Sequence, residues 1–154
     1  MRETVDILGV RIDKITAEYA LKKAERYVRT PGVSVIYTPN PEIIMAARED
    51  PAFRDVLNEA DMCTPDGIGV VKGAAMLGTP LKEKTPGIEF AAGLMEKMAE
   101  RGRSLYLLGA KPGVADLAAE RLQKQYPRLK IAGTHDGYFK EDAPVVEAIR
   151  ESGA

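Results

Sequence analysis

The pattern of apolar and polar positions predicts helices that alternate with short strands. Apolar side chains recur at helical spacing over 17–28, between the N-cap candidate Thr16 and the stop signal Pro31-Gly32. Asn40-Pro41 and Asp50-Pro51 each place an N-cap residue before a proline. Since proline is well suited to the first position of a helix, two short helices are predicted to begin there.

The remaining apolar segments extend the same alternation to the end of the chain. Short strands are predicted at 33–37, 62–64, 105–108 and 130–134. Further helices are predicted over 68–77, 88–98, 114–122 and 142–149. The helix over 68–77 is apolar nearly all round, so we expect it to be buried. This alternation predicts an α/β fold, with a Rossmann-like parallel sheet covered by helices on both faces.

The length of 154 residues fits one domain, and we see no internal repeat or interdomain linker over 1–154. The sequence ends at Ser152-Gly153-Ala154, where the alternation of helices and strands calls for another strand. The prediction is therefore a single core domain that lacks a final strand.

Composition excludes several classes of function. The 22 basic and 23 acidic residues give a net charge of −1, without the basic excess of a nucleic-acid-binding protein. With one cysteine, Cys63, and one histidine, neither a disulfide framework nor a Cys/His metal site can form within the chain. The acidic N-terminus lacks the apolar core of a signal peptide, and no run reaches the ~20 apolar residues of a membrane-spanning helix.

The most informative segment is 60–71, which places the carboxylate of Asp66 in a turn between two apolar runs. Pro65 restricts the backbone before it, while Gly67 and Gly69 allow close approach of backbone or substrate. Asp66 is therefore a candidate catalytic carboxylate. The alternative is that it only caps the helix that follows, because aspartate is among the commonest N-cap residues.

Three motifs in this order resemble the WecG/TagA/CpsF glycosyltransferase family: residues 38–42 (Thr-Pro-Asn-Pro-Glu), 61–71 and 133–139. The resemblance is strongest to the TagA branch. It implies transfer of N-acetylmannosamine from UDP-N-acetylmannosamine to undecaprenyl-diphosphate-linked N-acetylglucosamine, in the synthesis of the wall teichoic acid linkage unit. It also implies a cytoplasmic, peripheral membrane enzyme that works without a metal or other cofactor, and a C-terminal tail for membrane contact that is absent here.

The implied reaction converts an α-linked UDP-sugar into a β-glycoside and so inverts the anomeric carbon. One base must then remove the proton of the acceptor hydroxyl as UDP departs, and Asp66 is the candidate. Ligands of α/β sheets bind beyond the carboxyl ends of the strands. The residues expected to bind substrate at those ends are Thr38, Asn40, Lys84, Gly109, Lys111, Gly113 and Tyr138.

These binding residues have different predicted roles. We expect Thr38 to contact ligand and Asn40 to cap a helix. The turn over 109–113 offers backbone N–H groups and Lys111 to a diphosphate, although an ordinary helix-entry turn is the alternative. Tyr138 is a candidate to stack on uracil. A structural or solvated role is expected for His135.

Lys84 differs from the usual pattern of the family, which has arginine at this position in a segment of the type Arg-Val-x-Gly-x-Asp. Lysine cannot match the bidentate geometry of arginine on a phosphate. Two alternatives stay open. One is a relative that uses another donor, such as UDP-N-acetylmannosaminuronic acid, because these residues do not separate the two donors. The other is a non-catalytic module that binds UDP-sugar, which is consistent with Lys84 and with the missing final strand. The apolar run over 68–77 and the unpaired sheet edge also make a homodimer plausible.

Overall fold

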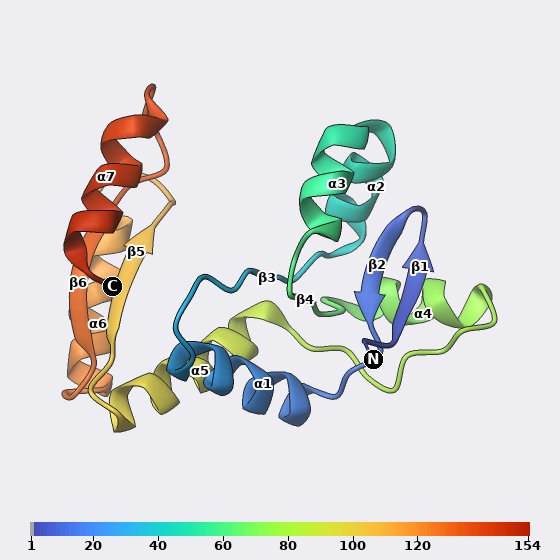
Figure 1. Ribbon diagram of the computed structural model, residues 1–154, viewed down its shortest axis with the longest axis horizontal. Coiled ribbons are helices and arrows are strands. Elements are labelled where there is room, and N and C mark those ends of the chain that lie inside the picture. The colour runs from blue at the N-terminus through green and yellow to red at the C-terminus, as the bar shows by residue number, and fades with distance from the viewer. Residues whose placement is uncertain (1) are drawn as a thin grey trace. The chain divides into compact units, whose positions relative to one another are not determined.

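The computed structural model describes residues 2–154, which fold as two compact units, the first ending at Leu94 and the second being Met95–Ala154. Figure 1 shows short strands and helices along the whole chain. The α/β class is confirmed, with parallel pairing of β3 with β4 and of β5 with β6. Strand pairing within residues 2–154 forms three two-stranded sheets, one of which is antiparallel.

The antiparallel sheet is a hairpin at the start of the first unit that the apolar pattern did not predict. Strands β1 (Thr4–Ile7) and β2 (Val10–Asp13) pair through a turn at Leu8 and Gly9, whose φ angles are positive. The Asp6 side chain accepts a hydrogen bond from Gly9 N at 2.8 Å and stabilises this turn. The alternate side chains of the hairpin are buried and form part of the main core of this unit.

Helix α1 (Ala17–Arg29) begins where the sequence predicts, with the Thr16 hydroxyl accepting a hydrogen bond from Tyr19 N. Its Ala20 and Ala24 are fully buried in a second, smaller core of the first unit. Small side chains at these positions let the helix pack closely on Met62 of strand β4.

The parallel pair of the first unit is very short and is followed on each strand by helices. Strand β3 (Ile36–Tyr37) pairs with β4 (Met62–Cys63), and helices α2 (Pro41–Glu49) and α3 (Pro51–Asn58) connect them. Both predicted N-caps are confirmed. Asn40 accepts from Ile43 N at 2.9 Å, and Asp50 accepts from the backbone of the first turn of α3.

Helix α4 (Ile68–Met76) forms as predicted, but the expectation that it is buried on all sides is wrong. Val70 and Ala74 pack into the core, whereas Ile68 is 59% and Met76 88% exposed. The helix packs one face against strand β1 and leaves its other face uncovered by the described residues. The apolar composition of α4 therefore predicted more burial than the structure shows.

The second unit is a parallel strand pair with helices, close to the sequence prediction. Strand β5 (Ser104–Leu108) pairs with β6 (Lys130–His135), and helices α6 (Val114–Gln125) and α7 (Asp142–Ser152) follow them. Helix α5 (Gly87–Glu100) includes the boundary between the units. Gly133 lies directly against the Tyr106 ring, so a larger side chain at 133 would displace that ring.

Candidate active site

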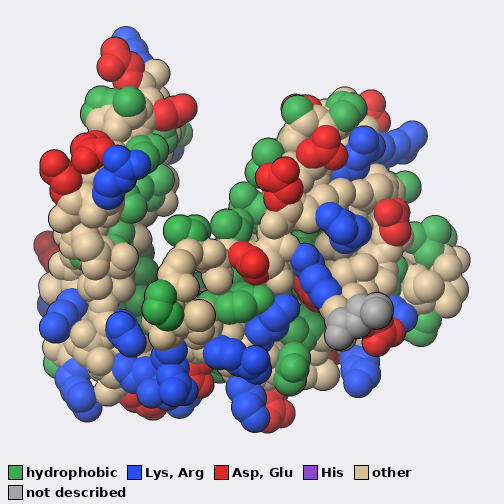
Figure 2. All heavy atoms as spheres, viewed as in Figure 1, with side chains coloured by type: hydrophobic (Ala, Val, Ile, Leu, Met, Phe, Trp, Pro, Cys, Tyr) green, Lys and Arg blue, Asp and Glu red, His purple; other side chains and the backbone are tan. Residues whose placement is uncertain are grey.

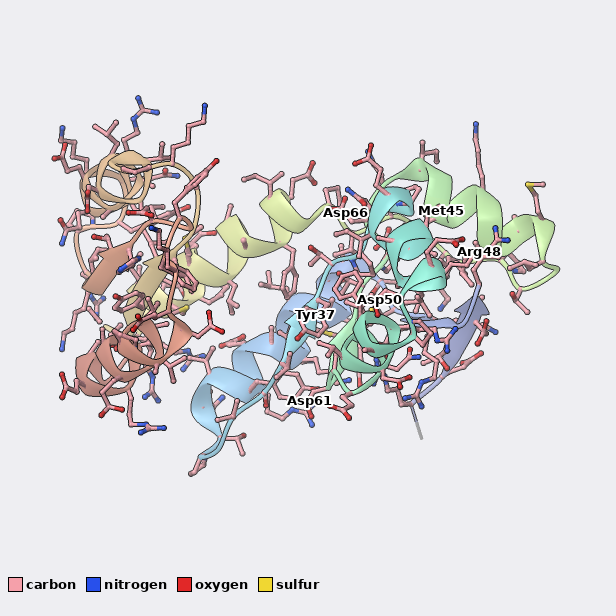
Figure 3. The ribbon with its side chains drawn as sticks, turned by 90° about the horizontal axis from the view of Figure 1, so that it is seen from above. Tyr37, Met45, Arg48, Asp50, Asp61 and Asp66 are labelled. Carbon is pink, nitrogen blue, oxygen red and sulfur yellow. The ribbon has the colours of Figure 1, made fainter. Side chains whose placement is uncertain are left out.

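The parallel pairing of β3 and β4 brings the segments that follow these strands together. Thr64 N donates to Tyr37 O at 2.9 Å, and Asp66 N donates to Pro39 O at 3.2 Å. The two segments therefore continue side by side beyond the strands. Figure 3 shows Asp66 near the N-terminal end of α4, where its carboxylate is half-buried.

A third segment, 85–87, completes the surroundings of this carboxylate. Thr85 N donates to Pro65 O at 2.7 Å, and Gly87 N donates to the Asp66 Oδ2 atom at 3.2 Å. Gly87 is the first residue of α5, so the carboxylate lies at the positive end of that helix. Among the described residues, Gly87 N–H is the one hydrogen-bond donor that the Asp66 side chain engages.

The absence of a side chain at Gly87 allows this geometry. A Cβ atom at Gly87 would come within 2.7 Å of Thr38 Oγ1 and 3.2 Å of Asp66 Oδ2. Both distances are tighter than ordinary contacts between a methyl carbon and an oxygen. The lack of a Cβ atom at Gly87 therefore lets the Thr38 hydroxyl and the Asp66 carboxylate both lie close to this residue.

Asp66 does not cap helix α4, so this alternative interpretation of the residue is wrong. Gly67 is the N-cap residue, with a φ of 92°, and α4 has no side-chain cap hydrogen bond. Gly69 packs against the ring of Pro41, where a Cβ atom would come within 2.7 Å of the ring. These contacts fix the turn, and the Asp66 carboxylate lies against the start of α5 instead of the start of α4.

Two buried hydroxyl groups flank the Asp66 loop, and sequence reasoning did not single them out. Thr64 and Thr85 are at most 1% exposed, and neither hydroxyl has a hydrogen-bond partner among the described residues. Most buried polar atoms have a partner, so a pair without one is unusual. The signal in the sequence was their position beside prolines that lead into the site.

The structure brings together three of the predicted site residues in the first unit: Thr38, Asn40 and Asp66. Asn40 is engaged as the cap of α2, whereas the half-buried Thr38 faces the position beside Gly87. Lys84 lies on the same connecting segment as Thr85, but its side chain is exposed.

An apolar cavity of about 300 Å³ adjoins Thr38 in the same unit. It lies between the end of β3 and the helices α2 and α3, and its size is at the lower end of the range of small-molecule sites. Its lining residues are Ile36, Tyr37, Thr38, Pro39, Ile43, Phe53, Val56 and Leu57.

The other predicted binding residues lie at the corresponding strand ends of the second unit. Gly109 N donates to His135 O at 2.9 Å, and Gly137 N donates to Ala110 O at 2.8 Å. These bonds bring the turn over 109–113 next to the loop that carries Tyr138, whose side chain is exposed. The structure therefore confirms that both loops are at the carboxyl ends of β5 and β6.

The turn over 109–113 leads into α6 through Gly113, which has left-handed backbone geometry. Lys111 is exposed at this end of the helix, as a diphosphate site requires. However, Asp116 lies in the first turn of α6 and accepts a hydrogen bond from the Thr134 hydroxyl. This carboxylate already provides negative charge at the helix N-terminus and disfavours a second anion there.

The single histidine makes two local contacts in the second unit. His135 Nδ1 lies 2.8 Å from Asp136 O, and its ring meets Phe139 edge to face at 5.7 Å. Both contacts stabilise the loop after β6, which fits the structural role expected for this residue.

Residues 2–154 contain no group of three or more histidine, cysteine, aspartate or glutamate side chains arranged to hold a metal ion. In this part of the chain, none of the helices combines the length and the apolar character needed to cross a bilayer.

Comparison with known proteins agrees with the motifs around Asp66. The profile of the glycosyl transferase WecG/TagA/CpsF family matches residues 5–154. The chain is similar to two proteins named N-acetylglucosaminyldiphosphoundecaprenol N-acetyl-beta-D-mannosaminyltransferase. That of Bacillus spizizenii is 35% identical over 117 residues, which cover 76% of this chain and 46% of the relative. That of Staphylococcus aureus strain NCTC 8325 is 32% identical over 148 residues, covering 95% and 58% respectively.

The chain thus spans about half the length of the curated relatives that it matches. The match of the family profile extends over both units of the structure, including the Asp66 loop and the strand ends of the second unit. The chain therefore belongs to the glycosyl transferase WecG/TagA/CpsF family.

Proposed function

We propose that the chain is the core of an inverting glycosyltransferase that moves N-acetylmannosamine from UDP to undecaprenyl-diphosphate-linked N-acetylglucosamine. The observation that carries the proposal is the position of Asp66, a half-buried carboxylate held by one main-chain N–H at the carboxyl end of β4. The names of the relatives support the acceptor and the β-linked product. The UDP donor and the inversion follow from the resemblance and from the chemistry of the product.

The proposed mechanism needs a base on the side of the acceptor. A carboxylate offers about four lone-pair positions, and Gly87 N–H takes one of those on Asp66. The others are free to accept the proton of the acceptor hydroxyl as its oxygen attacks the anomeric carbon and the bond to UDP breaks. Help from a positioned general base is typically worth about 10²–10⁴ in rate.

The departing UDP takes the electron pair of the broken bond, so its diphosphate needs positive partners. In this proposal basic side chains and backbone N–H groups supply them, without a metal ion. Lys84 and the Thr38 hydroxyl are the candidates in the first unit. In the second unit, Lys111 and the backbone N–H of Gly113 are the candidates, whereas Gly109 N–H already donates to His135 O and the Asp116 carboxylate disfavours an anion at this helix end. Tyr138 is proposed to stack on uracil.

The proposed location follows from the acceptor. A lipid-linked acceptor lies in a membrane, whereas UDP-sugars are water-soluble, so the enzyme acts at the boundary between the two. We place it at the cytoplasmic face of the bacterial membrane, as a peripheral protein.

The test is Asp66→Asn, with Asp55→Asn as the matched control. Asparagine keeps an oxygen that can accept from Gly87 N–H but cannot act as the base. Asp55 is an exposed carboxylate on α3 in the same unit. We expect Asp66→Asn to lower kcat by about 10²–10⁴. Calorimetric titration should show a Kd for UDP that changes by less than about threefold, since the base acts on the acceptor.

Four results would contradict parts of this proposal. Unchanged transfer in Asp66→Asn means that Asp66 is not the base. Equal loss of UDP affinity and turnover means that Asp66 binds the donor. Tight UDP binding without transfer, in the unaltered protein, favours a non-catalytic UDP-sugar module, and transfer from UDP-N-acetylmannosaminuronic acid alone favours the other donor. Calorimetric titration with UDP, with and without magnesium, tests whether UDP binding needs a metal ion.

A further inference from the structure

The exposed face of helix α4 is apolar and basic, and the site described above does not use it. Ile68, Lys72, Ala75 and Met76 follow one another at helical spacing and are all exposed. We call these four residues the α4 face. Figure 2 shows hydrophobic side chains gathered at the C-terminal end of this helix. Contiguous exposed apolar patches rimmed by polar residues mark interaction sites.

The charged residues of the segment 67–82 have one sign. No acidic residue occurs over 67–82, whereas Lys72 and Lys82 are both present and exposed. The first acid after this stretch, Glu83, accepts a hydrogen bond from Ala17 N at 2.6 Å and is engaged at the start of α1. A face of this kind complements a surface that is apolar inside and anionic outside.

We propose that the α4 face binds to the surface of a bilayer that contains anionic lipids. Ile68 and Met76 enter the region between head groups and acyl chains, while Lys72 extends its charged end to the phosphates. A helix that lies in the plane of the interface in this way has no need to span the membrane.

The α4 face follows Asp66 closely in the chain, which links membrane contact to catalysis. This step of the inference rests on the proposed function. Helix α4 begins two residues after Asp66 and extends about 12 Å from Ile68 to Met76, at 1.5 Å per residue. Binding this helix to the bilayer would hold Asp66 close to the head groups. The sugar of a lipid-linked acceptor would then reach the base while its hydrocarbon chain stays in the membrane.

The experiment is flotation of the protein with vesicles of phosphatidylcholine alone or mixed with phosphatidylglycerol. Met76→Glu is the test variant, because the 88% exposed Met76 side chain contributes little to the folded core. Leu117→Glu on α6 is the control, because Leu117 is 55% exposed, close to the exposure of Ile68. Circular dichroism checks that each variant is folded.

We expect binding to the anionic vesicles that Met76→Glu weakens roughly tenfold and Leu117→Glu leaves unchanged. Lys72→Ala should weaken binding roughly fivefold, the contribution of one basic residue near an anionic surface. That loss should shrink in high salt, because salt screens the charge but not the apolar contact. Transfer to a vesicle-embedded acceptor should fall in Met76→Glu, while transfer to a short water-soluble acceptor should not.

Other results would overturn this inference. Equal vesicle binding by Met76→Glu and Leu117→Glu would mean that the α4 face is not the contact. Conversion of a dimer to a monomer by Met76→Glu, in light scattering without vesicles, would show that a second copy covers the face. Failure of the proposed function gives a different pattern, in which the unaltered protein binds vesicles through α4 but neither binds UDP nor transfers sugar.

Discussion

The contact of Gly87 with Thr38 and Asp66 gives the sharpest test of the site. In Gly87→Ala, the new methyl group would lie 2.7 Å from Thr38 Oγ1 and 3.2 Å from Asp66 Oδ2. One or both side chains must move by several tenths of an ångström. Overpacking of this kind costs about 1–3 kcal/mol, offset by the roughly 0.5–1 kcal/mol that alanine gains over glycine within a helix. The expected net loss of unfolding free energy is about 1 kcal/mol.

The effect of Gly87→Ala on transfer should exceed its effect on stability. A displacement of 1 Å can lower a rate about 100-fold, so the smaller shift expected here should lower kcat roughly tenfold or more. Urea unfolding measures the change in stability, and a sugar-transfer assay measures the change in kcat. Gly73→Ala on α4 is the control, because a Cβ atom there meets nothing within 4 Å. It should not reduce stability or transfer.

A double substitution separates the steric effect from any other. Thr38→Ala removes the hydroxyl that the new methyl group would meet at 2.7 Å. In that background, Gly87→Ala should cost less stability than it does alone, since neighbouring substitutions are not additive. The reasoning is refuted if Gly87→Ala leaves both transfer and unfolding free energy unchanged, or if the cost is the same in both backgrounds.

Two further predictions concern the buried end of β2. The Asp13 carboxylate binds Arg2 in a bidentate pair at 2.7 and 2.8 Å and accepts from Cys63 N at 2.6 Å. Asp13→Ala should therefore cost about 3 kcal/mol in urea unfolding, and a loss below about 1 kcal/mol would contradict this. Burial raises the pKa of the Cys63 thiol from 9.0 to about 12. The contribution of the protonated Cys63 thiol to the free energy of unfolding is complete below pH 9. It is lost as the pH rises toward 12, at up to about 1.4 kcal/mol per pH unit. Cys63→Ala should remove this part of the pH dependence, and an unchanged slope would contradict the assignment.

The sequence predicted the elements whose signals are local. Asn40 and Asp50 stand directly before prolines, and each caps a helix through its own side chain. Cap chemistry depends on the next three residues only, so no knowledge of the rest of the fold was needed. The β1–β2 hairpin was missed because its strands are four residues each, although Asp6 and Gly9 carried the signal of its turn.

The features that were not predicted depend on contacts between distant segments. The composition of α4 could not show that only one of its faces meets the core, because its partner is strand β1, some 60 residues earlier. The bond between Gly87 N and Asp66 joins residues 21 apart. No local pattern marks it, and the motif around Asp66 fits either a cap or a base until that bond is known.

The way in which Asp66 is held has a consequence for which neighbouring positions can vary. Hydrogen bonds from Asp66 N to Pro39 O, from Thr85 N to Pro65 O and from Gly87 N to Asp66 Oδ2 fix the three segments around the carboxylate. Of these six groups, only the Asp66 carboxylate belongs to a side chain. Side chains that line the neighbouring cavity, such as Phe53, can therefore be exchanged without moving the base. Variants selected to retain transfer should therefore accept changes in the cavity wall and keep glycine at position 87.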